Sequence, residues 1–168
     1  MTLNLSRIIR HSAAAVITAA ALCSCHHVDN KRLPAVRVNL VFWSQADWVT
    51  YGVPGAADYR RFIREERVPS NYPYTASTYT GFGGVLLCND YFGNPVAYDL
   101  ACPVECNSKI RLFVNDDMHA ECPKCHSTYE IFEAYGHPVS GPAARDGYGL
   151  QTYWVGPGRT GEYMVVSN

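Results

Sequence analysis

Two short stretches carry the strongest structural signal: residues 96–106 read VAYDLACPVEC, and residues 122–131 read CPKCHSTYEI. Next to each cysteine pair, apolar and polar residues alternate with the period of a half-buried strand. Fifteen residues separate the two pairs. Two loops that each present two thiolates can enclose a metal from two sides, so the spacing indicates a metal or cluster site.

The rest of the chain is typical of an all-β protein. Short apolar or alternating segments recur, and turn residues separate them. The expected strands cover residues 36–40, 96–100, 110–114, 129–131, 152–155 and 163–166. Residues 81–88 (GFGGVLLC) read as a glycine-rich turn that leads into a further, buried strand. We predict a turn at 44–48, and a short helix or a loop over the charged stretch 58–67. This spacing favours a small antiparallel sandwich or barrel.

Composition narrows the functional classes. Of the 168 residues, 48% are hydrophobic and 17% are charged, which indicates a folded domain and not a disordered chain. The formal net charge is −1, so the chain lacks the basic excess of a nucleic-acid binder. It contains neither a nucleophile-elbow signature nor a phosphate-binding glycine motif. We therefore expect no catalytic activity of its own, although it can be an electron-transfer component of an oxidoreductase.

The first residues have the layout of a secretory signal. Arg7 and Arg10 precede the apolar run 13–22, which ends in the sequence LCSC at residues 22–25. This ending resembles the lipobox of bacterial lipoproteins, which implies a signal peptide at 1–24 and lipidation of Cys25. A tether at 25–34 and a folded domain at 35–168 would follow. The protein is then expected in the cell envelope, on the periplasmic or surface side, anchored to a membrane by lipid. The alternative is an ordinary signal peptide.

The cysteine stretches also resemble the Rieske iron–sulfur family, over residues 79–166. Members carry a first loop Cys-x-His and a second loop Cys-Pro-x-His or Cys-Pro-Cys-His-Gly-Ser, and a Gly-Pro-Ala segment follows. Here residues 96–103 fit the approach to the first loop, 122–130 the second loop, and 140–143 (SGPA) the later segment. The resemblance implies a Rieske-like β fold with a rubredoxin-like subdomain of two cysteine loops at about 97–143. It also implies a [2Fe–2S] cluster and one-electron transfer with a redox protein partner.

The ligand positions depart from the family pattern. The resemblance places Cys102 and Cys122 on the two ligand cysteines. Val104 stands at the first ligand histidine and cannot bind a metal, whereas Cys106 follows two residues later and can replace it. Cys125 stands at the second ligand histidine. The expected ligands are therefore Cys102, Cys106, Cys122 and Cys125.

Neighbouring residues are candidates for contacts to the sulfurs. His126 is an alternative ligand to Cys125, or a loop residue that donates a hydrogen bond to a sulfur, and we prefer the second interpretation. Ser127 and Tyr129 stand where the family has hydroxyls that hydrogen-bond the cluster; ordinary strand packing is equally compatible with both. Cys88 ends an apolar run and is expected to be a buried core thiol.

Three chemistries remain open for the four cysteines. A [2Fe–2S] cluster with four thiolates is sound, and so is one Zn²⁺ or Fe ion in a tetrahedral site. Two disulfides in an oxidising compartment are the third possibility. The main functional hypothesis is electron transfer, and the alternative is a non-redox structural or binding lipoprotein.

Overall fold

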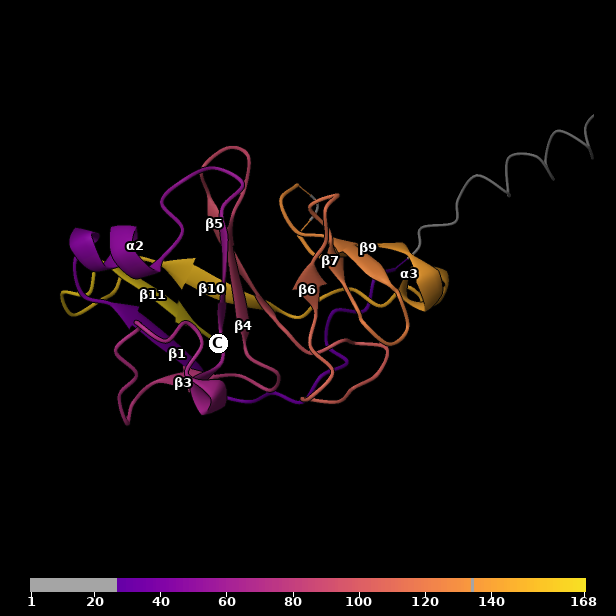
Figure 1. Ribbon diagram of the computed structural model, residues 1–168, viewed down its shortest axis with the longest axis horizontal. Coiled ribbons are helices and arrows are strands. Elements are labelled where there is room, and N and C mark those ends of the chain that lie inside the picture. The colour runs from indigo at the N-terminus through magenta and orange to yellow at the C-terminus, as the bar shows by residue number, and fades with distance from the viewer. Residues whose placement is uncertain (1–26, 134) are drawn as a thin grey trace, which may run out of the picture.

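The computed structural model describes residues 27–133 and 135–168, and in these ranges the chain is mostly β (Figure 1). The predicted signal peptide and Cys25 lie outside the described residues. The expected β class is confirmed as a nearly closed antiparallel sheet with a smaller antiparallel sheet beside it.

Seven of the described strands form the larger sheet. In spatial order they are β2 (Tyr59–Phe62), β4 (Val85–Asn89), β5 (Pro95–Asp99), β10 (Thr152–Gly156), β11 (Met164–Ser167), β1 (Val38–Phe42) and β3 (Tyr79–Thr80). All neighbours in this sheet are antiparallel. The first and last described strands pair directly, with Leu40 opposite Val166.

The smaller sheet is an insertion between two paired strands of the larger one. Its order is β6 (Phe113–Val114), β7 (Ala120–Glu121), β8 (Thr128–Glu130) and β9 (His137–Ser140), and helix α3 (Gly141–Asp146) follows β9 directly. Strands β5 and β10 pair across the insertion, with Tyr98 opposite Thr152. The chain therefore leaves the larger sheet after β5, forms both cysteine loops, and returns at β10 (Figure 1).

Strand β4 lies between two apolar cores and explains how the sheets are joined. All five of its residues are buried, which occurs when both faces of a strand are covered. Leu87 faces the core inside the larger sheet, together with Phe42 and Phe62. Leu86 faces a second core, which includes buried residues of the cysteine loops and smaller sheet. The smaller sheet is thus packed onto the larger one, and the cysteine loops are held against it.

Two local predictions are wrong. Residues 45–51 form helix α2 (Gln45–Tyr51) where the sequence predicts a turn, because Ser44 and Asp47 make a reciprocal capping box. Residues 59–62 form strand β2, and a 3-10 helix η1 (Arg64–Glu66) follows it in place of a helix or loop over 58–67. Pairing of β2 with the buried strand β4 decides this outcome. Among the described residues, the α-helices have seven and six residues, and neither can cross a membrane.

Candidate metal centre

The first cysteine loop is a tight turn directly after β5. The Cys106 N–H donates to the Cys102 carbonyl over 2.9 Å, and Cys106 has a positive φ of 47°. The Cys102 N–H donates to the Ile110 carbonyl over 3.2 Å. These bonds return the chain towards β6, and the Cys102 side chain is fully buried.

The second loop repeats this turn. The His126 N–H donates to the Cys122 carbonyl over 3.1 Å, and His126 has a positive φ of 54°. Cys122 directly follows β7 and is fully buried, like Cys102 in the first loop. In backbone geometry His126 is therefore the counterpart of Cys106, so the fifth position of both loops is left-handed.

Three of the four predicted ligands come together. The Sγ atoms of Cys102, Cys122 and Cys125 all lie within 4.8 Å of one another. Those of Cys102 and Cys125 are 3.6 Å apart. Cys106 is outside this group: its side chain is exposed, and its thiol donates to the Pro103 carbonyl over 3.1 Å. We call the group of three the cysteine triad.

The residues predicted near the sulfurs divide in the same way. The buried Ser127 Oγ lies 3.3 Å from Cys125 Sγ, and it also accepts a hydrogen bond from the Ala143 N–H in α3. The buried Tyr129 hydroxyl lies 3.8 Å from Cys102 Sγ. His126 is instead directed to the surface, where its Nδ1 lies 3.3 Å from a Glu121 carboxylate oxygen. Two of the three candidates thus contact the triad.

Burial and hydrogen bonds act unequally on the three thiols. Burial raises the pKa of Cys102 to about 12, and it also raises the pKa of Cys122. Burial opposes ionisation of Cys125 too, but hydrogen bonds with the Ser127 hydroxyl and backbone hold the pKa of Cys125 below its ordinary value. A metal that binds thiolates must therefore displace protons from Cys102 and Cys122, while Cys125 ionises most readily.

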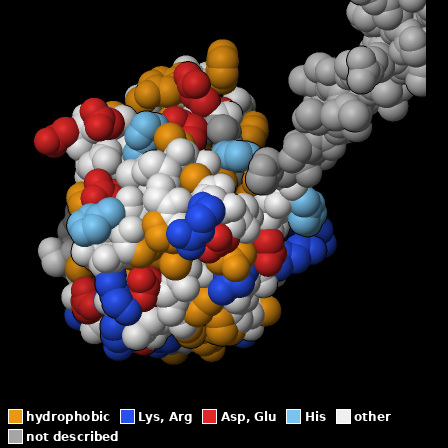
Figure 2. Space-filling view, turned by 90° about the vertical axis from the view of Figure 1, so that its right-hand side faces the viewer, with side chains coloured by type: hydrophobic (Ala, Val, Ile, Leu, Met, Phe, Trp, Pro, Cys, Tyr) orange, Lys and Arg blue, Asp and Glu red, His pale blue; other side chains and the backbone are white. Residues whose placement is uncertain are grey.

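Apolar and charged groups surround the triad on different sides. Val104, at the family's first histidine position, is half-buried against the same core as Cys102 and Cys122. On the outside, Lys124 Nζ forms an ion pair with Glu105 over 2.6 Å and so joins the two loops. The face seen in Figure 2 mixes acidic, basic and histidine side chains, without a large area of one charge.

Asp99 braces the first loop and is not identified as a site residue by the sequence. Its buried carboxylate accepts hydrogen bonds from the backbone N–H groups of Phe82, Gly83 and Ala101, at 2.7 to 2.9 Å. It also accepts one from the Tyr153 hydroxyl over 2.5 Å. These bonds attach the approach to Cys102 to a neighbouring turn and to β10. An acidic residue in an otherwise apolar strand was the available signal.

The segment before β1 runs beside the same loop. Asp29 exchanges backbone hydrogen bonds with Gly147 and Gly149, at 2.7 and 2.9 Å. The Arg32 guanidinium donates to the Pro103 carbonyl over 3.0 Å and lies 3.8 Å from the centre of the Tyr148 ring. The described part of the predicted tether, residues 27–34, is therefore attached to the cysteine-bearing part of the fold.

Comparison with family models, with curated proteins and with solved structures found no match to this chain.

Proposed function

We propose that the protein binds one metal ion through the thiolates of Cys102, Cys122 and Cys125. The observation that carries this proposal is the convergence of three sulfurs within 4.8 Å, two of them 3.6 Å apart. With metal–sulfur bonds of about 2.3 Å, neighbouring sulfurs of a tetrahedral site lie about 3.8 Å apart. One ion can therefore reach all three sulfurs with little movement of the loops.

The sulfur distances favour a single ion over a [2Fe–2S] cluster. In a cluster of the Rieske pattern, Cys102 and Cys122 would bind one iron, and Cys125 would bind the other. Ligands of different irons lie further apart than ligands of the same iron, whereas the Sγ atoms of Cys102 and Cys125 are only 3.6 Å apart. Thiolate ligands suit Zn²⁺ or Fe, and either ion would hold the two loops together.

One-electron transfer by a bound iron is the second candidate function. Its support is the pair of hydroxyls beside the sulfurs, Ser127 Oγ at 3.3 Å and Tyr129 at 3.8 Å. Hydrogen bonds to ligand sulfurs raise the reduction potential of a thiolate-bound iron. This candidate retains the Rieske-like fold, the rubredoxin-like pair of loops and a redox protein partner as parts of the proposal.

Metal analysis tests the proposal directly. The full-length protein, purified without oxygen, is expected to contain one Zn or Fe per chain and no acid-labile sulfide. Cys122→Ser should lose the metal, whereas Cys88→Ala should retain it, because the buried Cys88 lies outside the triad. Two irons with two sulfides would favour the cluster instead, and metal-free protein with thiols oxidised in pairs would contradict any metal function.

A separate variant tests the role of Cys106. Because its thiol is exposed and lies outside the triad, we expect Cys106→Ser to retain the metal. Loss of the metal in this variant would show that Cys106 is a fourth ligand and that the first loop moves when the ion binds.

We also propose that Cys25 is lipidated and anchors the protein in the bacterial envelope. Three residues separate Cys25 from Asp29. A chain extends at most about 3.6 Å per residue, so the anchor would hold the first cysteine loop near the bilayer. Membrane fractionation and intact-mass measurement test this point. Cys25→Ala should release the protein and remove the lipid mass, and Cys23→Ala should not.

A further inference from the structure

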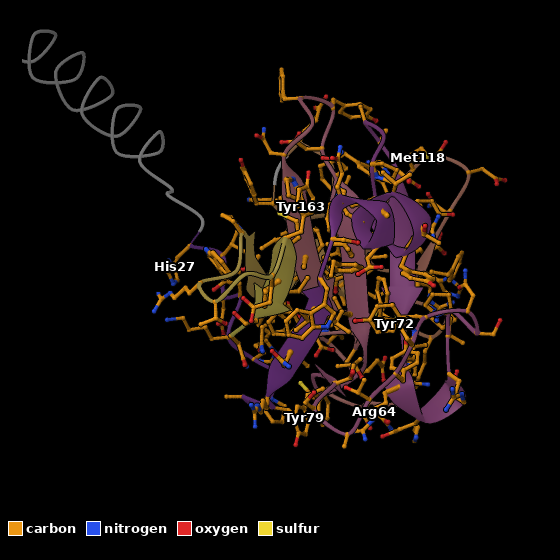
Figure 3. The ribbon with its side chains drawn as sticks, turned by 90° about the vertical axis from the view of Figure 1, so that its left-hand side faces the viewer. His27, Arg64, Tyr72, Tyr79, Met118 and Tyr163 are labelled. Atoms are coloured by element: carbon orange, nitrogen blue, oxygen red, sulfur yellow. The ribbon has the colours of Figure 1, made fainter. Side chains whose placement is uncertain are left out.

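The outer face of the larger sheet is covered at one end only. The smaller sheet packs over β4 and β5, whereas the outward side chains of β1, β10 and β11 line two open pockets. One pocket has a volume of about 440 Å³, the other about 280 Å³, and Asn39 and Val41 line both. The two pockets therefore adjoin at β1, and we call the pair of pockets the groove. Figure 3 shows the molecule from its left-hand side in Figure 1 and labels Tyr72, which lines the smaller pocket.

Each of the two pockets is lined by one exposed tryptophan. Trp154 lines the larger pocket and is 52% exposed, and Trp43 lines the smaller one and is 65% exposed. The Trp154 indole lies over Gly156, where an added Cβ would come within 2.4 Å of the ring. Glycine at this position thus lets one side of the indole rest on the strand, and the other side remains open to the groove.

Some polar groups near Trp154 already form hydrogen bonds within the protein, and others do not. The Glu162 carboxylate accepts hydrogen bonds from the Thr160 N–H and hydroxyl, over 3.0 and 2.7 Å, which fixes the β10–β11 turn. Arg159 makes no ion pair or side-chain hydrogen bond with any described residue. Asn39 donates its amide to the Ser77 carbonyl over 2.8 Å, which leaves its carbonyl oxygen for a ligand. The groove therefore offers an indole face, a guanidinium group with no ion pair to a described residue, and polar groups that are already held in place.

We propose that this groove binds a chain of pyranose sugars, with a preference for sugars that carry a carboxylate. A pyranose ring has an apolar C–H face that stacks on an indole, and a rim of hydroxyls that hydrogen-bonds to polar side chains. The larger pocket falls within the range of about 300–1,000 Å³ that is usual for small-ligand sites. One exposed tryptophan in each of two adjoining pockets suits a chain of several sugars. Arg159, which forms no ion pair with a described residue, suits an acidic one.

Nuclear magnetic resonance of the indole N–H groups provides the test, because the chain has three tryptophans and therefore three such signals. Trp48 is an internal reference, since its ring packs at 5.0 Å against the buried Phe42. The probes are hexasaccharides of gluco, manno and galacto configuration, each with its matched uronic acid. At least one pair should shift the Trp154 signal and leave the Trp48 signal unchanged, with the acidic member binding more tightly.

Variants separate the parts of the proposal. Trp154→Ala should weaken binding about tenfold, and Trp154→Phe less, because the phenyl ring keeps a stacking face. Arg159→Gln should remove the preference for the acidic member, by up to about fivefold, and leave the neutral member unaffected. The proposal is overturned if no probe shifts Trp154, if binding survives in Trp154→Ala, or if the Trp154 signal instead moves with protein concentration, which would indicate self-association. None of these results depends on the metal content.

Discussion

Replacing Tyr153 with Phe removes one atom from the network that braces the first cysteine loop. The Tyr153 side chain is 7% exposed, and its hydroxyl donates to the Asp99 carboxylate over 2.5 Å. A hydrogen bond to a charged group contributes about 1.5–3 kcal/mol, and the phenyl ring leaves the packing otherwise unchanged. We therefore expect the free energy of unfolding at pH 7 to fall by that amount, and the melting temperature by about 3–12 °C.

The loss should depend on pH. Burial raises the pKa of Asp99, and the Tyr153 hydrogen bond partly opposes this rise. Because the folded pKa lies above the unfolded value, the free energy of unfolding falls as pH rises from the unfolded pKa through the folded one. Tyr153→Phe raises the folded pKa further, so its cost should be larger at pH 7 than at pH 3.

Urea unfolding followed by circular dichroism at both pH values measures this cost. Tyr163→Phe is the matched control, because Tyr163 is 42% exposed, and its cost should stay within about 0.5 kcal/mol. A Tyr153→Phe variant as stable as the wild type at pH 7 would refute the bracing role of Asp99. A cost that grows towards low pH would refute the assigned sign of the pKa effect.

Three further predictions concern the site. In metal-free protein, Ser127→Ala should raise the pKa of Cys125, because the substitution removes a hydrogen bond that lowers this pKa. The pH dependence of Cys125 alkylation, followed by peptide mass, measures the pKa. An unchanged alkylation profile would contradict the prediction. Gly141→Ala should lower the free energy of unfolding by at least about 1–2 kcal/mol, because Gly141 has a φ of +74° and an added Cβ would lie 2.9 Å from the Ser127 Cα. Gly55→Ala is the control, because an added Cβ there would meet nothing within 4 Å. Removing the metal with a chelator should lower the melting temperature, by the equivalent of about 2.7 kcal/mol if free metal stood at a hundred times its dissociation constant. Cys122→Ser should be insensitive to the chelator, and a wild type equally insensitive would indicate that no bound metal stabilises the fold.

The strands were predictable wherever one local pattern agreed with the tertiary environment. Alternation around Val38 and Leu40 predicts β1, and the apolar run at 85–88 predicts β4. Residues 59–62 carry too many charges to predict a strand, and only pairing with β4 makes them one. At α2 the signal was present, because Ser44 and Asp47 have capping-box spacing, but seven residues are too few to show helical periodicity.

The sequence predicts the sulfur chemistry of the candidate site, but not which of the cysteines lie close together. The two cysteine pairs predict that the sulfur atoms lie close together, and three of the four do. Sequence spacing could not place Cys106, because its direction depends on the left-handed residue that ends the turn. Cys125 stands one position earlier in its loop than Cys106 does, so it faces the interior, while the left-handed position is occupied by His126.

The pairing of β1 with β11 has a consequence for how the protein acquires its structure. These strands lie far apart in the chain, yet they are hydrogen-bonded neighbours in the larger sheet. Contacts of such high sequence separation form slowly, because a long loop must close before they can stabilise anything. Until β11 pairs with β1, the larger sheet is incomplete. The cysteine thiols are then part of an incompletely folded chain, in a compartment that we expect to be oxidising. If the metal that we propose binds before β11 pairs with β1, it would protect the thiols from mispairing while the remaining strands assemble.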